Sequence, residues 1–399
     1  ANGMSFCRPL SLCSRAMPHA TDCLAISVGQ ASQPVFADPA RKACGMTASL
    51  VSVQGLAKNF VARRSFFGRP EKFVRAVDGI DLEIRQGETL AVVGESGCGK
   101  STLGRLVLRL IEADQGRIVF ENDDLTTLDP QALRAMRRKA QLIFQDPFAS
   151  LNPRMTVGDL LSEPLMLHRI VPADQRAARV AQLLQQVGLK ADHAGRYPHE
   201  FSGGQRQRIA IARAIAVEPK LIVCDEPVSA LDVSIRAQVL NLLSDLQKQL
   251  KLSYLFISHD LSVVRHIADR VAVMYLGRIV ELGSVEQVFE TPRHPYTQAL
   301  LRAIPQPVVG HRHKNLLDGD VPSPLDPPSG CHFQTRCPFV KEACTHKRPP
   351  LETVAGEHQV ACLRHADITP EPIIGLHGTG NETLQKLMRA FVEKSQKAG

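Results

Sequence analysis

The stretch Gly94-Glu95-Ser96-Gly97-Cys98-Gly99-Lys100-Ser101 decides the fold, because it fits the pattern G-x-x-x-x-G-K-[ST]. A short apolar run at residues 90–93 precedes it, and a helix-like segment at residues 101–111 follows it. This context predicts a loop whose backbone N–H groups surround phosphate oxygens at a helix N-terminus. Lys100 would place its charge on the β- and γ-phosphates, and Ser101 would offer its hydroxyl to Mg²⁺. The stretch therefore indicates a nucleoside triphosphate as ligand.

Outward from this loop, strand-like and helix-like segments alternate. Runs typical of strands occur at residues 51–60, 80–84, 118–120, 141–144, 221–224, 254–257 and 271–275. The clearest helix pattern covers residues 235–250, and the basic, Phe-bearing residues 61–73 indicate a loop or hairpin tip. Residues 152–218 show helix patterns without a convincing strand. We predict an α/β sheet covered on both faces, with a helical subdomain inserted at about residues 152–218.

Composition sets wide limits. The chain has 399 residues and is 44% apolar, which excludes a largely disordered or collagen-like protein and suits two or three domains. No run of 18 apolar residues occurs, so we expect no membrane-spanning helix. The 48 Lys and Arg residues against 40 Asp and Glu residues give a net charge of +8, which fits anionic partners without choosing among them. Residues 1–48 lack a clear period and are expected to be a disordered extension, with a targeting segment as the alternative.

Two adjacent carboxylates, Asp225 and Glu226, end the apolar strand at residues 221–224. Two carboxylates in such a place are costly without a cation. We expect Asp225 to hold Mg²⁺ through water and Glu226 to polarise the water that attacks the γ-phosphate. An N-cap for the next helix is the alternative, but it explains only one of the two.

A second anion-binding helix start is expected at Ser202-Gly203-Gly204-Gln205. One nucleotide does not need two such sites in one chain. The presence of both anion-binding sites is explained if each chain supplies the loop at residues 202–205 to the nucleotide held by a partner chain.

The set of motifs resembles that of the ATP-binding subunits of ABC transporters, in order and spacing over roughly residues 50–290. The likeness rests on residues 94–101, Gln145, residues 202–205, Asp225 with Glu226, residues 229–232 and His259. It implies an ABC-type P-loop ATPase domain over residues 49–291, with ATP and Mg²⁺ bound.

The same resemblance implies particular roles. Gln145 is the lid glutamine that senses Mg²⁺ and contacts the membrane subunit, Asp232 lies in the loop that crosses the dimer interface, and His259 is the switch histidine that touches the γ-phosphate. Phe60 is the aromatic residue that stacks on adenine, and Thr102 is a further nucleotide contact. The neighbouring aromatic residues leave three alternatives to Phe60: Phe66, Phe67 and Phe73.

Three features narrow the resemblance to the dipeptide/oligopeptide importer subfamily, in particular its F-type ATPase subunit: residues 145–154, residues 293–297 and the Pro- and Cys-rich end. This implies ATP hydrolysis that energises peptide import at the cytoplasmic face of the inner membrane. The implied partners are a homologous second ATPase, two transmembrane permease subunits and an extracytoplasmic solute-binding protein, and no nucleic acid. Glutathione, haem or nickel complexes are alternative solutes, and a soluble ABC-type ATPase acting on nucleic acid or ribosomes is the rival class.

Four cysteines gather in the region 292–366, which we expect to be small and irregular: Cys331, Cys337, Cys344 and Cys362. The subfamily resemblance implies that they ligate a 4Fe–4S cluster, which would cross-link a region with little core. Zinc and free thiols are the alternatives. Cys98 and Cys224 are expected to be small space-filling residues inside the ATP motifs. The tail, residues 367–399, is expected to carry an amphipathic helix at residues 382–395.

Overall fold

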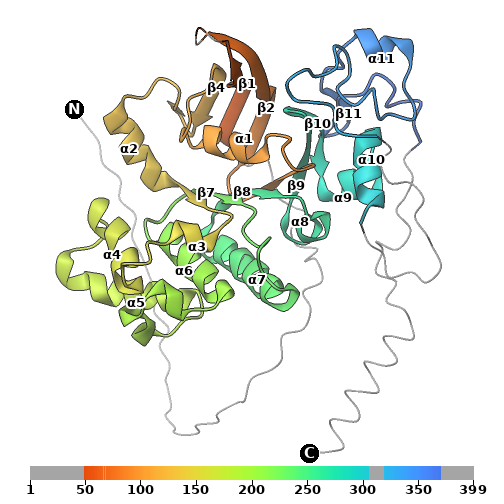
Figure 1. Ribbon diagram of the computed structural model, residues 1–399. Coiled ribbons are helices and arrows are strands. Elements are labelled where there is room, and N and C mark those ends of the chain that lie inside the picture. The colour runs from red at the N-terminus through yellow and green to blue at the C-terminus, as the bar shows by residue number, and fades with distance from the viewer. Residues whose placement is uncertain (1–48, 66, 68, 305–318, 370–399) are drawn as a thin grey trace, which may run out of the picture. The chain divides into compact units, whose positions relative to one another are not determined.

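The computed structural model describes residues 49–304, apart from residues 66 and 68, and residues 319–369 (Figure 1). The elements below belong to the compact unit Thr47–Gly399. The expected extension at residues 1–48, the amphipathic stretch at residues 382–395 and the alternative aromatic residue Phe66 lie outside the described residues.

An eight-stranded sheet has the order β11-β12-β10-β9-β3-β8-β7-β6. Its strands are β3 (Thr89–Val93), β6 (Ala140–Ile143), β7 (Leu221–Asp225), β8 (Ser253–Ser258), β9 (Arg270–Tyr275), β10 (Arg278–Ser284), β11 (Glu352–Ala355) and β12 (His358–Val360). Neighbours among β6, β7, β8, β3 and β9 pair in parallel. Val93 is level with Ser258, and Asp225 is level with Ile257, so the carboxyl ends of β3, β8 and β7 meet at one edge. Open parallel sheets bind their ligands at that edge.

A smaller antiparallel sheet has the order β2-β1-β4-β5. Its strands are β1 (Ser49–Arg64), β2 (Pro70–Arg85), β4 (Gln115–Phe120) and β5 (Asp123–Asp124). Of the two alternatives for residues 61–73, a loop or a hairpin tip, the structure has the hairpin tip, but a shorter one than predicted, because β1 and β2 continue to pair as far as Arg64 and Pro70. Strand pairing gives the backbone N–H and C=O groups hydrogen-bond partners within the protein, whereas in a long loop they would bond to water. Only the tip, residues 65–69, remains between the two strands.

The helices surround these sheets. They are α1 (Lys100–Val107), α2 (Pro130–Lys139), α3 (Pro147–Ser150), α4 (Val157–Leu167), α5 (Arg176–Gln186), α6 (Gly203–Ile215), α7 (Val233–Leu250), α8 (Leu261–Ile267), α9 (Val285–Glu290), α10 (Pro295–Arg302) and α11 (Glu342–His346). The helix predicted to extend to residue 111 ends at Val107, because Arg109 takes a left-handed φ of 47°. Within the described ranges, no helix is long and apolar enough to cross a membrane.

Alternate residues of the central strands pack into two separate cores. Val93 and Phe256 face a core built with α4–α8, whereas Val92 and Leu255 face a core built with α1 and the smaller sheet. This alternation is the period-two pattern of a sheet buried on both faces. The second face is therefore covered by a sheet as well as by helices, as Figure 1 shows for β1, β2 and β4 beside α1.

The C-terminal region is less irregular than predicted. The hairpin of β11 and β12 joins the large sheet through the pairing of β12 with β10. Glu281 of β10 is fully buried and accepts hydrogen bonds from the N–H groups of Arg293 (2.7 Å) and His294 (3.0 Å), while His358 Nε2 lies 2.7 Å from its carboxylate. Strands of four and three residues are too short to show a period, so this hairpin could not be predicted from the sequence.

Candidate functional site

The phosphate loop joins β3 to α1, and two of its glycines lie against backbone. Gly94 has a φ of 154°, and a Cβ there would be 2.1 Å from the carbonyl oxygen of Met274. Gly99 has a φ of 106°, and a Cβ there would be 1.9 Å from the carbonyl oxygen of Ala76. Any side chain at either position would clash, so glycine is required for the loop to close in this form.

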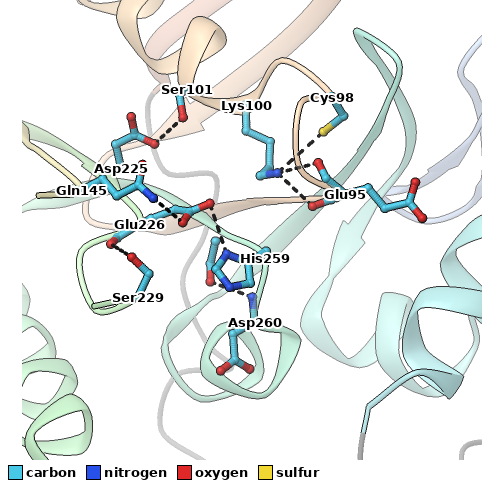
Figure 2. A network of polar contacts seen from close by, with 12 residues as sticks. Glu95, Cys98, Lys100, Ser101, Gln145, Asp225, Glu226, Ser229, His259 and Asp260 are labelled. Carbon is cyan, nitrogen blue, oxygen red and sulfur yellow. Dashed lines mark hydrogen bonds and ion pairs between the residues drawn. The ribbon is translucent and has the colours of Figure 1, made fainter. Parts of the chain in front are cut away.

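Lys100 is the first residue of α1, and its side chain lies inside the loop (Figure 2). Its buried Nζ donates hydrogen bonds to the carbonyl oxygens of Gly94 (2.9 Å) and Glu95 (2.8 Å). Cys98 Sγ lies 3.8 Å from the same nitrogen, and burial raises the pKa of the Cys98 thiol. The loop thus holds one positive charge at its centre, beside a neutral thiol.

Ser101 and Asp225 meet across the sheet edge. Ser101 Oγ donates a 2.7 Å hydrogen bond to Asp225 Oδ1. Burial raises the pKa of Asp225, and the Ser101 hydrogen bond and the charge of Arg105 oppose that shift without reversing it. A hydroxyl and a carboxylate oxygen are ligands that Mg²⁺ prefers, so this pair fits a magnesium ion shared with phosphates.

Glu226 lies at the centre of a contact between three loops. Gln145 Nε2 donates a 3.0 Å hydrogen bond to Glu226 Oε2, and His259 Nδ1 lies 3.2 Å from Glu226 Oε1. The Glu226 side chain is 16% exposed, whereas that of His259 is 56% exposed. Figure 2 shows the three side chains converging beside Asp225. The structure therefore brings together the residues that the sequence placed after β6, β7 and β8.

Within the part of the chain that the structure describes, the loop at residues 202–205 makes no hydrogen bond or ion pair to this network. The N–H of Gln205 donates to Ser202 Oγ (3.4 Å), and the N–H of Ser202 donates to Gln205 Oε1 (3.1 Å), so the two form a capping box at the start of α6. Gly203 and Gly204 form the first turn, and a Cβ at Gly204 would lie 2.3 Å from Ile235 Cγ2. Figure 1 shows α6 among the helices α4, α5 and α7, apart from α1.

Phe60 and Asp232 also lie outside the network. Phe60 is in β1, 42% exposed, with the Lys58 ammonium 5.7 Å from its ring centre. Asp232 precedes α7 and is exposed, and its side chain makes no capping hydrogen bond. The other predicted contacts are the exposed Ser96 and Gly97, which lie in the phosphate loop, and the half-buried Thr102 in α1.

Sequence reasoning missed a set of contacts that the C-terminal region makes with the phosphate loop. Arg336 donates from both terminal nitrogens to the Glu95 carboxylate, at 2.9 and 3.1 Å. The Glu95 N–H donates a 2.9 Å hydrogen bond to the hydroxyl of Tyr296, at the start of α10. Arg336 is 241 residues away from Glu95 in the chain, so no local pattern could have indicated the pair.

The four C-terminal cysteines line one cavity, together with His294 and Phe333. Burial, together with the neighbouring thiols, raises the pKa of three of the thiols, those of Cys331, Cys337 and Cys362, to about 11 in each case. Four thiols on one cavity are the kind of donor set that iron–sulfur clusters use. Within the described ranges, no three His, Cys, Asp or Glu side chains are grouped closely enough to hold a single metal ion.

Comparison with known proteins shows which families the chain is similar to. The family model described as ABC transporter matches residues 77–229, and the model described as oligopeptide/dipeptide transporter, C-terminal region, matches residues 280–344. The chain is 51% identical over 315 residues to the dipeptide transport ATP-binding protein DppF of Escherichia coli (strain K12), covering 79% of this chain and 94% of that protein. It is 50% identical over 318 residues to the oligopeptide transport ATP-binding protein AppF of Bacillus subtilis (strain 168), covering 79% and 97%.

A solved structure agrees with the fold. The dimeric post-hydrolysis state of the ATP-binding cassette MJ0796, bound to ADP and Pi, matches with a TM-score of 0.53 and 26% identity, covering 59% of this chain and 98% of that chain. A phosphate loop and its acidic partners at the carboxyl edge of such a sheet define a P-loop nucleoside triphosphatase. The chain belongs to the ABC transporter ATP-binding proteins of the dipeptide/oligopeptide subfamily.

Proposed function

We propose that this chain is the ATP-hydrolysing subunit that energises import of dipeptides or oligopeptides through a membrane ABC transporter. The observation that carries the proposal is the network in which Glu226 contacts both Gln145 and His259 beside the pair of Ser101 and Asp225. The peptide as solute is supported by the match to the oligopeptide/dipeptide C-terminal region and by relatives named for dipeptide and oligopeptide transport.

Each residue of the network has a proposed role in phosphoryl transfer. Lys100 and the loop N–H groups bind the β- and γ-phosphates, and Ser101, Asp225 and Gln145 hold Mg²⁺, which neutralises phosphate charge when bound. Glu226 accepts a hydrogen bond from the attacking water, and His259 orients the γ-phosphate. Catalysis then depends on positioning and charge neutralisation rather than on covalent chemistry.

The loop at residues 202–205, in which Ser202 is exposed, supports a clamp of two chains. It presents a capped helix N-terminus that its own nucleotide site does not use. We assign it to the nucleotide of a homologous second ATPase subunit, with Asp232 in the loop that crosses the interface. The assembly would include two transmembrane permease subunits and an extracytoplasmic solute-binding protein, with this chain at the cytoplasmic face of the inner membrane.

Substituting Glu226→Gln tests the catalytic assignment. The amide keeps the shape and the contact with Gln145 but cannot accept a proton, so ATP turnover by the assembled complex should be lost while MgATP still binds. Glu112→Gln, an exposed carboxylate paired with Arg109, should leave turnover unchanged. Wild-type turnover in the Glu226→Gln complex would refute the role given to Glu226.

We also propose that the thiol cavity holds a 4Fe–4S cluster, through Cys331, Cys337, Cys344 and Cys362. The support for this proposal is that the four thiols line one cavity, since a 4Fe–4S cluster takes four thiolate ligands. When bound, the cluster would supply iron–thiolate bonds that cross-link this region.

Metal analysis of an anaerobic preparation tests the cluster. The full-length protein should be brown and contain iron and acid-labile sulfide, and Cys331→Ser should lower both. Cys98→Ser, in the phosphate loop, is the control and should keep them. A colourless preparation that contains zinc and no iron would contradict the proposal.

A further inference from the structure

The ion pair between Arg336 and Glu95 joins the C-terminal region to the phosphate loop. Two parallel hydrogen bonds of 2.9 and 3.1 Å hold the carboxylate in a fork, which fixes its orientation as well as its position. The Arg336 side chain is 5% exposed and that of Glu95 is 24% exposed, so the pair is shielded from solvent screening. Arg336 directly precedes Cys337, which lines the thiol cavity.

Tyr296 holds the same loop residue from a second direction. Its hydroxyl accepts the Glu95 N–H at 2.9 Å, and its fully buried ring packs on Tyr275, with ring centres 4.6 Å apart, and on Phe333, at 5.5 Å. The Glu95 carbonyl oxygen meanwhile accepts a hydrogen bond from Lys100. The carboxylate, the N–H and the C=O of one loop residue are therefore each held by a different partner.

Two physical consequences bear on nucleotide binding. A glycine-rich loop has many conformations, and fixing Glu95 before the nucleotide arrives removes part of the ordering cost of binding. The Glu95 carboxylate also lies in a loop that must receive an anion of high charge, and the Arg336 guanidinium neutralises it.

We propose that Arg336 and Tyr296 are positioning residues for ATP, which hold Glu95, and through it Lys100, in the arrangement that binds phosphate. The inference rests on the proposed function, because it presumes that this loop binds ATP. The C-terminal region would then take part in the nucleotide site, because Arg336 and Tyr296 lie outside the ATP motifs and contact Glu95 inside the phosphate loop.

Binding of the non-hydrolysable analogue AMP-PNP with Mg²⁺ to the full-length chain, measured by titration calorimetry, tests the proposal. Arg336→Met should weaken binding about tenfold or more. Tyr296→Phe keeps the ring packing and loses only the accepted hydrogen bond, so it should weaken binding less. Arg85→Met is the matched control, because the ion pair of Arg85 with Glu357 also ties the C-terminal region to the core but lies away from the loop. It should bind as the wild type does.

Further measurements separate positioning from general stability. The double variant Glu95→Gln with Arg336→Met removes both charges and should recover part of the affinity lost by Arg336→Met alone. In the assembled complex, Arg336→Met should raise the KM for ATP with little change in kcat. Arg336→Lys, which keeps the charge without the fork, should give an intermediate affinity and covers the case in which the methionine variant does not fold.

Wild-type affinity in a folded Arg336→Met protein, or an equal loss in Arg85→Met, would overturn the proposal. Failure of the wild-type chain to bind AMP-PNP, or binding retained in Lys100→Ala, would instead refute the proposed ATP site. The two failures are distinguishable because the wild type and Lys100→Ala are measured in the same series.

Discussion

Glu226 has a backbone conformation that few residues other than glycine adopt, with a φ of 46°. Its N–H donates to the carbonyl oxygen of Ile257 in β8 (3.0 Å), and its own carbonyl oxygen accepts from Ser229 Oγ (3.0 Å). The backbone is therefore fixed on both sides, and the turn points the carboxylate toward Gln145 and His259. Unusual backbone held in this way by its surroundings is typical of residues at functional sites.

Phe60 carries a prediction at the same scale. If its ring stacks on adenine, Phe60→Ala should weaken ATP binding by about 1–3 kcal/mol, the cost of losing one base–aromatic contact. Phe73→Ala is the matched control, because Phe73 lies on the neighbouring strand β2 and is exposed to a similar degree, 45% against 42%. Titration of both variants with ATP decides the matter, and a loss confined to Phe73→Ala would assign the stacking to that residue instead.

At the scale of elements, the sequence predicted the parts whose patterns are strong and local. The apolar runs of β3, β7 and β8 and the long amphipathic helix α7 were predicted correctly, and so the carboxyl edge that carries the network could be located. The hairpin of β11 and β12 could not, because three or four residues carry no measurable period and the pairing partner β10 is distant in the chain. Arg336 and Glu95 likewise meet only through the tertiary fold.

Helix α10 carries a prediction about pH. Its N-cap residue His294 accepts the Tyr296 N–H at Nδ1 (3.1 Å), and burial lowers the pKa of His294 from 6.5 to about 4, against the opposing charge of Glu281. As the pH falls below 6.5, the unfolded chain takes up a proton that the folded chain does not. Stability that is present above pH 6.5 should therefore be lost toward pH 4, by about 1.4 kcal/mol per pH unit.

Urea unfolding between pH 7 and pH 5 measures this slope. His294→Asn keeps a side-chain acceptor at the N-cap and has no ionisable ring, so its free energy of unfolding should fall less steeply with pH. Glu281, which accepts the His294 N–H, and His358, which contacts Glu281, are common to both proteins and cancel in the difference. His266→Asn, at an exposed position in α8, is the control. Equal slopes in the wild type and His294→Asn would show that His294 does not contribute to the pH dependence of the free energy of unfolding.

At the scale of the whole molecule, the proposed clamp requires one chain to offer two different halves of a nucleotide site. The edge of the large sheet carries the phosphate loop and the carboxylates, whereas the loop at residues 202–205 starts α6 in the helical part (Figure 1). Gly204 is packed on Ile235 of α7, so this loop is held by the helices around it rather than by the phosphate loop. In the proposed clamp, the nucleotide site of each chain is incomplete until the loop at residues 202–205 of the other chain is added.

The clamp predicts that Ser202 acts on a partner's nucleotide and not on its own. Ser202→Arg should leave MgATP binding by the isolated chain unchanged but should lower ATP turnover of the assembled complex at least tenfold, because the side chain blocks closure. Thr156→Arg is the matched control: Thr156 also caps a helix, α4, through a capping box with Asp159. Both variants should lose about 1 kcal/mol of stability with their caps. Equal turnover in the two complexes would rule out the clamp, since only the position of Ser202 distinguishes them.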